Sequence, residues 1–254
     1  MKVRDNHILV TGGGSGIGRG LAEAFHALGN QVIIAGRRKQ VLDQIVQANP
    51  GMASCVVDLQ NPKETLDFAA RISQAFPTLD VLINNAGIMR AENLLGQQDD
   101  LADMEAIVAT NLLGPIRLTA ALLPLLRRQP KSVVMNVSSG LAFVPLAMTP
   151  TYCATKAALH SYTQSLRYQL QGSTTQVIEL IPPYVATDLM HGAEDPRAMP
   201  LGAFIAEVMN LIEIHPEATE ICVENVKRLR FAAETGKYEA LFQGFNDAMT
   251  QDRS

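Results

Sequence analysis

The sequence predicts an α/β fold in which a doubly wound parallel sheet of about seven strands is flanked by helices on both faces. Short apolar runs alternate with helical segments along all 254 residues, and strands separated by helices are typical of a parallel sheet. No internal repeat, low-complexity tract or linker interrupts this alternation. We therefore expect a single domain over residues 1–254.

The first predicted elements are a strand over 7–10 and a helix over 17–28, joined by a glycine-rich turn and closed by Gly29 as a C-cap residue. Between a strand and a helix, a glycine run is typical of phosphate binding. Glycines let a pyrophosphate approach the backbone, and the helix N-terminus offers free N–H groups. The alternative is a turn that binds nothing. The candidate cofactor-binding residues here are Gly12, Ser15, Gly16, Ile17 and Gly18.

The later elements continue the alternation. Strands are expected at 31–35, 53–57, 79–83, 132–137 and 176–181, with a possible edge strand at 220–223, and helices at 38–48, 63–75, 99–110, 111–128, 152–170 and 202–213. Pro115 and Pro124 predict a break or kink in the segment that holds them. The polar segment 188–200, marked by glycine and proline, predicts a loop over the site and not a domain boundary.

Composition excludes several classes of protein. Hydrophobic residues make up 47% and charged residues 18% of the chain, which indicates a soluble globular protein and excludes a disordered one. A net charge of −4 shows no basic excess, so we expect no nucleic-acid partner. No apolar run reaches the roughly eighteen residues of a membrane span, and residues 1–6 leave no room for a signal peptide.

Cysteine usage points to a reducing compartment. Cys55, Cys153 and Cys222 are odd in number, scattered and without metal-ligand spacing, so we expect reduced thiols, a cytoplasmic protein and no metal site. Cys153 adjoins a candidate catalytic tyrosine, and a buried small side chain is the favoured interpretation over a redox role.

The end of the second strand indicates the choice of dinucleotide. An acidic residue there would bind a ribose 2′-hydroxyl and select NAD. This chain has Arg37 and Arg38 instead, and guanidinium groups suit a 2′-phosphate. We expect NADP(H) to be preferred, with NAD(H) possible. In the alternative, Arg37 stacks on an adenine and Arg38 is solvated.

Ser139, Tyr152 and Lys156 are the candidate catalytic residues. Tyr152 and Lys156 are four residues apart, so they project from one helix face. A lysine ammonium favours a phenolate and is expected to lower the pKa of Tyr152, which would let the tyrosine exchange a proton with an alcohol or ketone near neutral pH. Ser139 follows the strand 132–137 and is expected in the crevice where such sheets bind ligands.

Together these motifs resemble the short-chain dehydrogenase/reductase family, over about the first 190 residues. Five motifs occur in the family's order, and a sixth, Pro182 to Thr187, is partly kept, with Pro183 where the family usually has glycine. The five are Thr11 to Gly18, Asp58 with Leu59, Asn84 to Gly87, Asn111, and Ser139 with Tyr152 and Lys156. The resemblance implies a Rossmann-like sheet, with 1–130 mainly binding the dinucleotide and 131–254 serving catalysis and substrate binding.

The resemblance also implies roles for single residues. Tyr152 would be the general acid or base, Ser139 would bind the reacting oxygen, and Lys156 would also bind the nicotinamide ribose. Asn111 would hold a relay water, unless it satisfies backbone groups at a helix terminus. Asp58 would contact adenine, although an N-cap role that Asn61 could equally fill is the alternative, and Ser138 is the rival of Ser139. The other implied cofactor contacts are Leu59, Asn85, Ala86, Gly87, Val185 and Thr187.

The substrate is less well indicated. The run from Ser138 to Leu146 and the Pro182–Pro183 pair resemble a narrower branch, the oxidoreductases named after the teichoic-acid D-alanylation operon, a name that specifies no substrate. Residues where family members line the substrate cleft are apolar, so we expect an apolar carbonyl or alcohol, although half of them could equally serve the core. They are Leu141, Phe143, Val144, Pro145, Met148 and Met190. His160 is expected on a helix surface or an interface.

The resemblance implies an enzyme that transfers hydride between a nicotinamide and a carbonyl or secondary alcohol. The alternatives are a catalytically silent dinucleotide-binding regulator and, among enzymes, a 3-oxoacyl carrier-protein reductase. The latter should carry a basic patch near the cleft, where 188–200 offers His191 and Arg197. The family's use of the helices at 99–128 and 152–170 implies a homodimer or homotetramer. The apolar C-terminal stretch with Phe231, Leu241, Phe242 and Phe245 could complete a second interface or the cleft wall.

Overall fold

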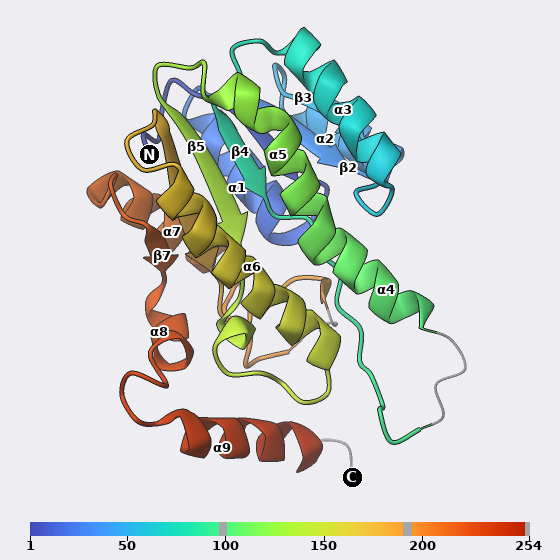
Figure 1. Ribbon diagram of the computed structural model, residues 1–254, viewed down its shortest axis with the longest axis vertical. Coiled ribbons are helices and arrows are strands. Elements are labelled where there is room, and N and C mark those ends of the chain that lie inside the picture. The colour runs from blue at the N-terminus through green and yellow to red at the C-terminus, as the bar shows by residue number, and fades with distance from the viewer. Residues whose placement is uncertain (97–100, 190–194, 252–254) are drawn as a thin grey trace.

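A seven-stranded, wholly parallel sheet forms the centre of the protein, in the order β3-β2-β1-β4-β5-β6-β7. The computed structural model describes residues 1–96, 101–189 and 195–251. The strands are β1 (His7–Thr11), β2 (Gln31–Gly36), β3 (Ala53–Val56), β4 (Val81–Asn84), β5 (Ser132–Val137), β6 (Thr175–Ile181) and β7 (Glu220–Cys222). Helices cover both faces of the sheet (Figure 1). The predicted fold class is confirmed, including the edge strand.

The helices match the predicted segments up to residue 214, except that residues 99 and 100 of the predicted helix 99–110 lie outside the described residues. These helices are α1 (Gly16–Ala27), α2 (Lys39–Ala48), α3 (Pro62–Ala75), α4 (Ala102–Val108), α5 (Gly114–Leu126), α6 (Pro150–Gln169) and α7 (Leu201–Ile214). Two further helices, α8 (Glu224–Arg230) and α9 (Tyr238–Gln251), were not predicted. In Figure 1, α9 runs across the end of the molecule, next to the segment that precedes α6.

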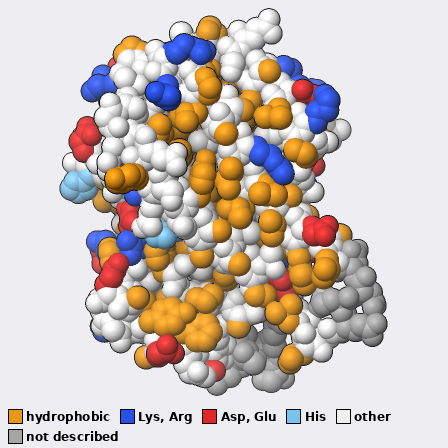
Figure 2. Space-filling model, in the orientation of Figure 1, with side chains coloured by type: hydrophobic (Ala, Val, Ile, Leu, Met, Phe, Trp, Pro, Cys, Tyr) orange, Lys and Arg blue, Asp and Glu red, His pale blue; other side chains and the backbone are white. Residues whose placement is uncertain are grey.

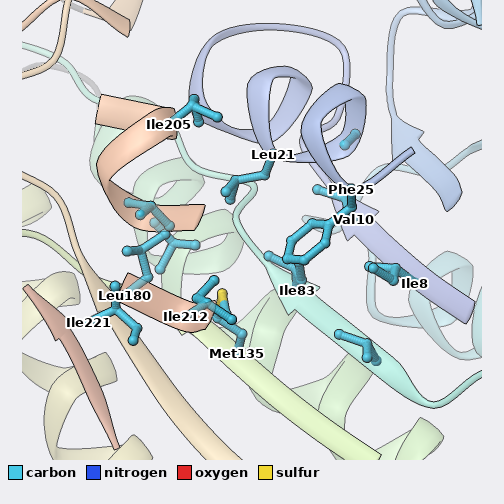
Figure 3. Packing of buried hydrophobic residues seen from close by; sticks show 14 of the residues in the cluster. Ile8, Val10, Leu21, Phe25, Ile83, Met135, Leu180, Ile205, Ile212 and Ile221 are labelled. Carbon is cyan, nitrogen blue, oxygen red and sulfur yellow. The ribbon is translucent and has the colours of Figure 1, made fainter. Parts of the chain in front are cut away.

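Alternate residues of the strands supply two separate cores. Ile8 and Val10 of β1 are buried on one face with Phe25 of α1, as Figure 3 shows. Leu9, between them in sequence, is buried on the other face in the cluster that includes Leu118 of α5. Successive strand residues point to opposite faces, so continuous apolar runs are what a sheet covered on both sides requires.

The helical segment 102–126 is interrupted near Pro115, as the sequence predicts. A π-helical turn, η1 (Ala109–Leu113), separates α4 from α5, and Pro115 falls in the first turn of α5, where its missing N–H costs little. Pro124 lies inside α5, which continues to Leu126. Single π-turns within helices often occur at functional sites, and this one carries Asn111.

The same segment, Ala102–Leu126, is long and apolar enough to cross a membrane by length and composition, with a mean hydropathy of 1.6. The sequence analysis expected no apolar run of that length, because the polar residues within the segment interrupt it. Its apolar side chains, among them Leu118, Leu122 and Leu126, are buried against the sheet, and 44% of the apolar window is buried inside the protein. A helix that packs in the core, against a sheet covered on both faces, can have the same length and apolar composition as a membrane-spanning helix.

Candidate active site at the carboxyl edge of the sheet

A cavity of about 1230 Å³ is lined by residues that follow the carboxyl ends of six strands, β1 to β6. The strand order reverses between β1 and β4, and open α/β sheets bind ligands in the crevice at such a point. Of the predicted site residues, those lining the cavity are Gly12, Ser15, Gly16, Ile17, Arg37, Arg38, Asp58, Leu59, Asn85, Ala86, Gly87, Ser139, Tyr152, Lys156, Val185 and Thr187. Among the described residues, Gly18 and Asn111 lie outside its lining.

Close packing explains the glycines of the first turn. Gly12 has a φ of +66°, and a Cβ there would lie 2.8 Å from the Cα of Ala86. A Cβ on Gly18 would lie 2.3 Å from Nδ2 of Asn85, so Gly18 packs the turn against the loop that follows β4. Gly14 borders the cavity, and a Cβ there would make only ordinary contacts. The turn is therefore fixed on its protein side and open toward the cavity.

Ser15 and Arg38 are joined at the start of α1. Within the described part of the chain the Ser15 hydroxyl does not cap the helix; it accepts a hydrogen bond of 2.8 Å from Nη2 of Arg38. Arg37 and Arg38 are both exposed and line the cavity. A helix N-terminus and a guanidinium group thus lie at one end of the cavity, which is the environment that phosphate groups favour.

Thr11 and Asn85 hold the first turn to the loop after β4. The Thr11 hydroxyl accepts hydrogen bonds from the N–H groups of Asn85 and Ala86, at 3.0 and 3.1 Å. The amide Nδ2 of Asn85 donates in return to the carbonyl of Thr11 at 3.0 Å. Asn85 and Ala86 therefore combine a structural role with their position in the cavity wall.

Asp58 does not cap the next helix. Asn61 is the N-cap residue of α3, and its side chain accepts a hydrogen bond from the N–H of Glu64 at 3.1 Å. Asp58 accepts one from the N–H of Gln60 at 3.0 Å and lines the cavity. Asn61 therefore fills the N-cap role that was the alternative for Asp58. Asp58 instead faces the candidate dinucleotide site.

Ser139, Tyr152 and Lys156 meet in the cavity wall. Ser139 follows β5 and caps a short 3₁₀ turn, η2 (Gly140–Ala142), while Tyr152 and Lys156 come from α6. Lys156 Nζ lies 5.6 Å from the centre of the Tyr152 ring and donates a 2.8 Å hydrogen bond to the carbonyl of Val137. Ser139 hydrogen-bonds Tyr152. Ser138 also borders the cavity, but its hydroxyl is directed to the carbonyl of Leu180, so the geometry favours Ser139.

Burial controls the acid–base properties of this group. It raises the pKa of Tyr152 above its ordinary value, and the hydrogen bond from Ser139 opposes that rise. Burial also lowers the pKa of Lys156 to about 8, and the negative charge of Glu179 opposes that fall. The expectation that Lys156 lowers the pKa of Tyr152 is therefore wrong for this structure, because the loss of hydration on burial outweighs the hydrogen bond with Ser139, which is the interaction that lowers this pKa.

Asn111 lies behind the wall, on the π-turn η1. Its Oδ1 accepts a 2.8 Å hydrogen bond from the N–H of Ile88, and its Nδ2 donates one of 2.8 Å to the Ile88 carbonyl. Its side chain is fully buried. The structure therefore shows the backbone-satisfying role that the sequence left open, and Asn111 fixes the loop that holds Gly87.

The segment after β6 lines the cavity and contacts the glycine turn. The Pro182 carbonyl accepts a 2.9 Å hydrogen bond from the N–H of Gly140, which ties this segment to the turn after Ser139. Val185 forms a β-bridge with Met199. A Cβ on Gly16 would come within 3.2 Å of the Thr187 side chain, so Thr187 lies directly against the glycine turn.

The wall beside Tyr152 is apolar. Leu141 and Met148 line the cavity as predicted, whereas Phe143, Val144 and Pro145 do not, and Met190 lies outside the described residues. Val144 is buried among α8 and α9 instead. Sequence reasoning missed Ile88, Met89 and Leu146, which lie on loops and carry no periodic signal.

Phe245 of α9 completes this wall. It packs with Tyr152, Leu146 and Met148 in one apolar cluster and lines the cavity. Asn246 anchors the helix, since it accepts a 2.6 Å hydrogen bond from the N–H of Ala147 and donates one of 3.2 Å to the Pro145 carbonyl. Of the two roles considered for the C-terminal stretch, Phe245 takes that of cleft wall.

His160 is neither a free surface residue nor a cavity residue. Its Nδ1 lies 2.7 Å from Oε2 of Glu179, a fully buried carboxylate on β6, and its ring meets that of Phe143 edge to face. The sequence analysis missed Glu179, because a single acid in a strand gives no sign of its partner. Cys153 is buried, as expected.

Comparison with known proteins shows what this geometry resembles. Residues 6–198 match the family model described as short chain dehydrogenase. The chain is 36% identical, over 97% of its length and 98% of the relative's, to an uncharacterized oxidoreductase, DltE, of Bacillus subtilis. It is 32% identical over 197 residues to dehydrogenase/reductase SDR family member 7B of Bos taurus, of which it covers 60%.

Solved structures share the fold. A short chain dehydrogenase from Burkholderia cenocepacia, in complex with NADP, superimposes with a TM-score of 0.81 at 24% identity, covering 95% of this chain and 99% of that one. A 3-oxoacyl (acyl-carrier-protein) reductase from Agrobacterium tumefaciens, with NADP bound, gives a TM-score of 0.76 at 25% identity, covering 86% and 92% of the two chains.

Proposed function

The chain belongs to the short-chain dehydrogenase/reductase family, and from that premise we propose that it is an NADP(H)-dependent oxidoreductase that interconverts an apolar carbonyl compound and its secondary alcohol. The observation that carries this proposal is the meeting of Ser139, Tyr152 and Lys156 in one apolar cavity wall. A catalytically silent regulator would have no use for a buried lysine beside a buried tyrosine, since burying both costs stability.

The residues of the first turn fit a dinucleotide. The open side of the glycine turn and the N-terminus of α1 would hold the pyrophosphate, Asp58 and Leu59 would contact the adenine, and Lys156 would bind the nicotinamide ribose. Gly87, with Asn85 and Ala86, would contact the adenosine ribose. Val185 and Thr187 would meet the carboxamide through their backbone groups. When bound, the nicotinamide supplies or takes up the hydride.

Arg37 and Arg38 support NADP(H) over NAD(H). Arg38 is held by Ser15 at the end of the cavity where a ribose 2′-phosphate would lie, and a guanidinium forms paired hydrogen bonds with phosphate. No acidic side chain stands at the end of β2 to accept a 2′-hydroxyl. NADP is also the dinucleotide in the Burkholderia and Agrobacterium proteins.

The chain's own residues would carry the proton. In reduction, Tyr152 donates its phenolic proton to the carbonyl oxygen and Ser139 hydrogen-bonds the same oxygen, which fixes its position and stabilises the developing negative charge. The raised pKa of Tyr152 keeps that proton in place until charge develops on the substrate. Asn111 positions this group indirectly, through the loop that carries Gly87.

A carrier-protein reductase is the second candidate. The sequence analysis looked for a basic patch in 188–200, where Arg197 is paired with Asp195 at 2.7 Å and His191 lies outside the described residues. Instead, Arg228 of α8 and Arg90 border the cavity, while Lys227 beside them is paired with Glu224 at 2.6 Å. These cations give an acidic carrier a place to dock, so a 3-oxoacyl thioester belongs in the substrate panel.

We also expect a cytoplasmic homodimer or homotetramer. Figure 2 shows hydrophobic side chains gathered over the face that α5 and α6 cover in Figure 1. Ala120 and Pro124 of α5 are exposed, as is Leu113 at the end of η1, directly before α5. A second copy of the chain is the partner that would cover this face symmetrically.

Turnover of NADPH and NADH across a panel of ketones, aldehydes, diketones and 3-oxoacyl thioesters tests the proposed function. We expect NADPH to be used in preference, and Tyr152→Phe to lower kcat at least about a hundredfold, because it removes the general acid. Tyr162→Phe, which changes another tyrosine of α6, is the matched control and should retain activity.

Activity that survives in Tyr152→Phe would refute the mechanism. Tight NADPH binding without turnover on any member of the panel would favour the regulator.

A further inference from the structure

A buried carboxylate lies behind the catalytic group and has no place in the mechanism above. Glu179 of β6 is fully buried. Its Oε2 contacts Nδ1 of His160 at 2.7 Å, and its Oε1 has no hydrogen-bond partner among the described residues. Burying a carboxylate costs several kcal/mol unless positive charge or hydrogen bonds compensate for it. A positive charge near Glu179 is therefore expected.

Lys156 lies in the same layer between α6 and the sheet. Lys156 and His160 are four residues apart on α6, so they share one face of the helix. Lys156 donates to the carbonyl of Val137, and Val137 is in register with Leu180, the residue after Glu179. Both Lys156 and Glu179 are screened from water, with exposed fractions of 4% and 0%. Charges in so dry a layer act on each other more strongly than at the surface.

The other charged groups near Glu179 are already engaged. Arg230 of α8 binds both carboxylate oxygens of Glu220, at 2.8 and 3.1 Å, and also pairs with Glu234. Arg167 of α6 donates to the carbonyls of Val177 and Thr219. Cys222 of β7 is a thiol whose pKa burial raises to about 12, so it is neutral near pH 7. Glu220, on the neighbouring strand, has its charge matched by Arg230.

We propose that Glu179 is the buried counter-ion of Lys156, held in place by His160, and that it keeps the Lys156 ammonium charged beside Tyr152. The proposal rests on the proposed function, because that function assigns Lys156 to the nicotinamide ribose beside Tyr152. Glu179 touches neither the reacting atoms nor the cavity and is therefore a positioning residue. The direction in which its charge moves the pKa of Lys156, upward against burial, agrees with this role.

A titration of Lys156 in the full-length enzyme, without substrate or cofactor, tests the proposal. Lysine labelled with ¹³C at the ε-carbon is followed by NMR against pH, and the Lys156→Arg variant identifies the signal. We expect a midpoint at about pH 8 in the unchanged protein. In Glu179→Gln the midpoint should fall by about one pH unit or more, the effect of losing an opposite charge close by.

Glu220→Gln is the matched control, because it removes a neighbouring carboxylate that Arg230 already neutralises. In this variant the titration midpoint of Lys156 should be unchanged. An unchanged midpoint in Glu179→Gln, or an equal fall in Glu220→Gln, would overturn the proposal.

A second pair of variants keeps the test decisive if Glu179→Gln does not fold. His160→Asn retains an N–H donor for the carboxylate and should preserve the Lys156 midpoint, whereas His160→Leu removes the donor and should lower it. Equal midpoints in these two variants would refute the part assigned to His160. The titration needs no turnover, so a lowered Lys156 midpoint combined with no activity on any carbonyl would uphold the counter-ion and reject the proposed function.

Discussion

Lys156 is the single residue whose burial most directly affects the proposed reaction, because burial changes the pH at which it loses its charge. The residue is 4% exposed and burial lowers its pKa to about 8, so it carries its charge below that pH and loses it above. The charged ammonium of Lys156 would bind the nicotinamide ribose. From the sequence alone, the spacing of Tyr152 and Lys156 predicted a lowered pKa for the tyrosine. Spacing shows that the two residues are neighbours on a helix, but it does not show that folding removes water from both.

A pH profile checks this assignment. We expect kcat/KM for carbonyl reduction by NADPH to be nearly level below about pH 8 and to fall at higher pH, since the free enzyme loses the Lys156 charge there. The acid side should stay level because Tyr152, whose pKa is raised, keeps its proton throughout. A profile that rises through pH 8 in the reductive direction would contradict the assignment.

At the scale of elements, α9 decides the shape of the substrate pocket. Tyr238 and Phe242 stack at 6.1 Å on this helix, while Phe245 reaches the cavity and the cluster around Tyr152. The sequence showed an apolar stretch there but no means of choosing between an interface and a wall. The choice depends on Asn246 and its hydrogen bonds to the loop before α6, a contact across about a hundred residues of chain.

Phe245→Ala should therefore widen the pocket. We expect kcat/KM for a bulky ketone to rise about tenfold relative to a small one, because an aromatic ring that limits the space beside Tyr152 is removed. Phe242→Ala, on the same helix but outside the cavity lining, is the control and should leave the ratio unchanged. Competition between two ketones of different size in one reaction measures this ratio directly. Equal ratios in the two variants would show that Phe245 does not limit the space beside Tyr152.

The whole molecule presents an apolar face over α5 and α6, which the sequence analysis expected from the family's mode of assembly. Ala120 lies at the centre of the exposed stripe of α5. Ala120→Arg places a charge there, and we expect it to shift the protein to a monomer in light scattering after size-exclusion chromatography, because a charge without a partner opposes burial.

Gln44→Arg, on an exposed position of α2, is the control for assembly and should keep the mass of the unchanged protein. If the unchanged protein is a monomer, the proposed interface is excluded. If an oligomer survives in Ala120→Arg, the interface lies elsewhere on the molecule.

Features that depend on local order along the chain could be predicted from the sequence alone. Continuous apolar runs and helical spacing specified the seven strands and the helices as far as α7, because period and length are properties of the chain alone. The glycine turn and the spacing of Tyr152 and Lys156 located both ends of the cavity for the same reason.

Which groups meet across the fold, and what surrounds them, could be learned only from the tertiary structure. Glu179 lies beside His160, Asn111 binds Ile88 and Phe245 reaches Tyr152 through contacts between distant segments. The sequence contains these residues but not their distances. The shifts in the pKa of Tyr152 and Lys156 follow from the same cause, because they depend on the water that folding removes from around them.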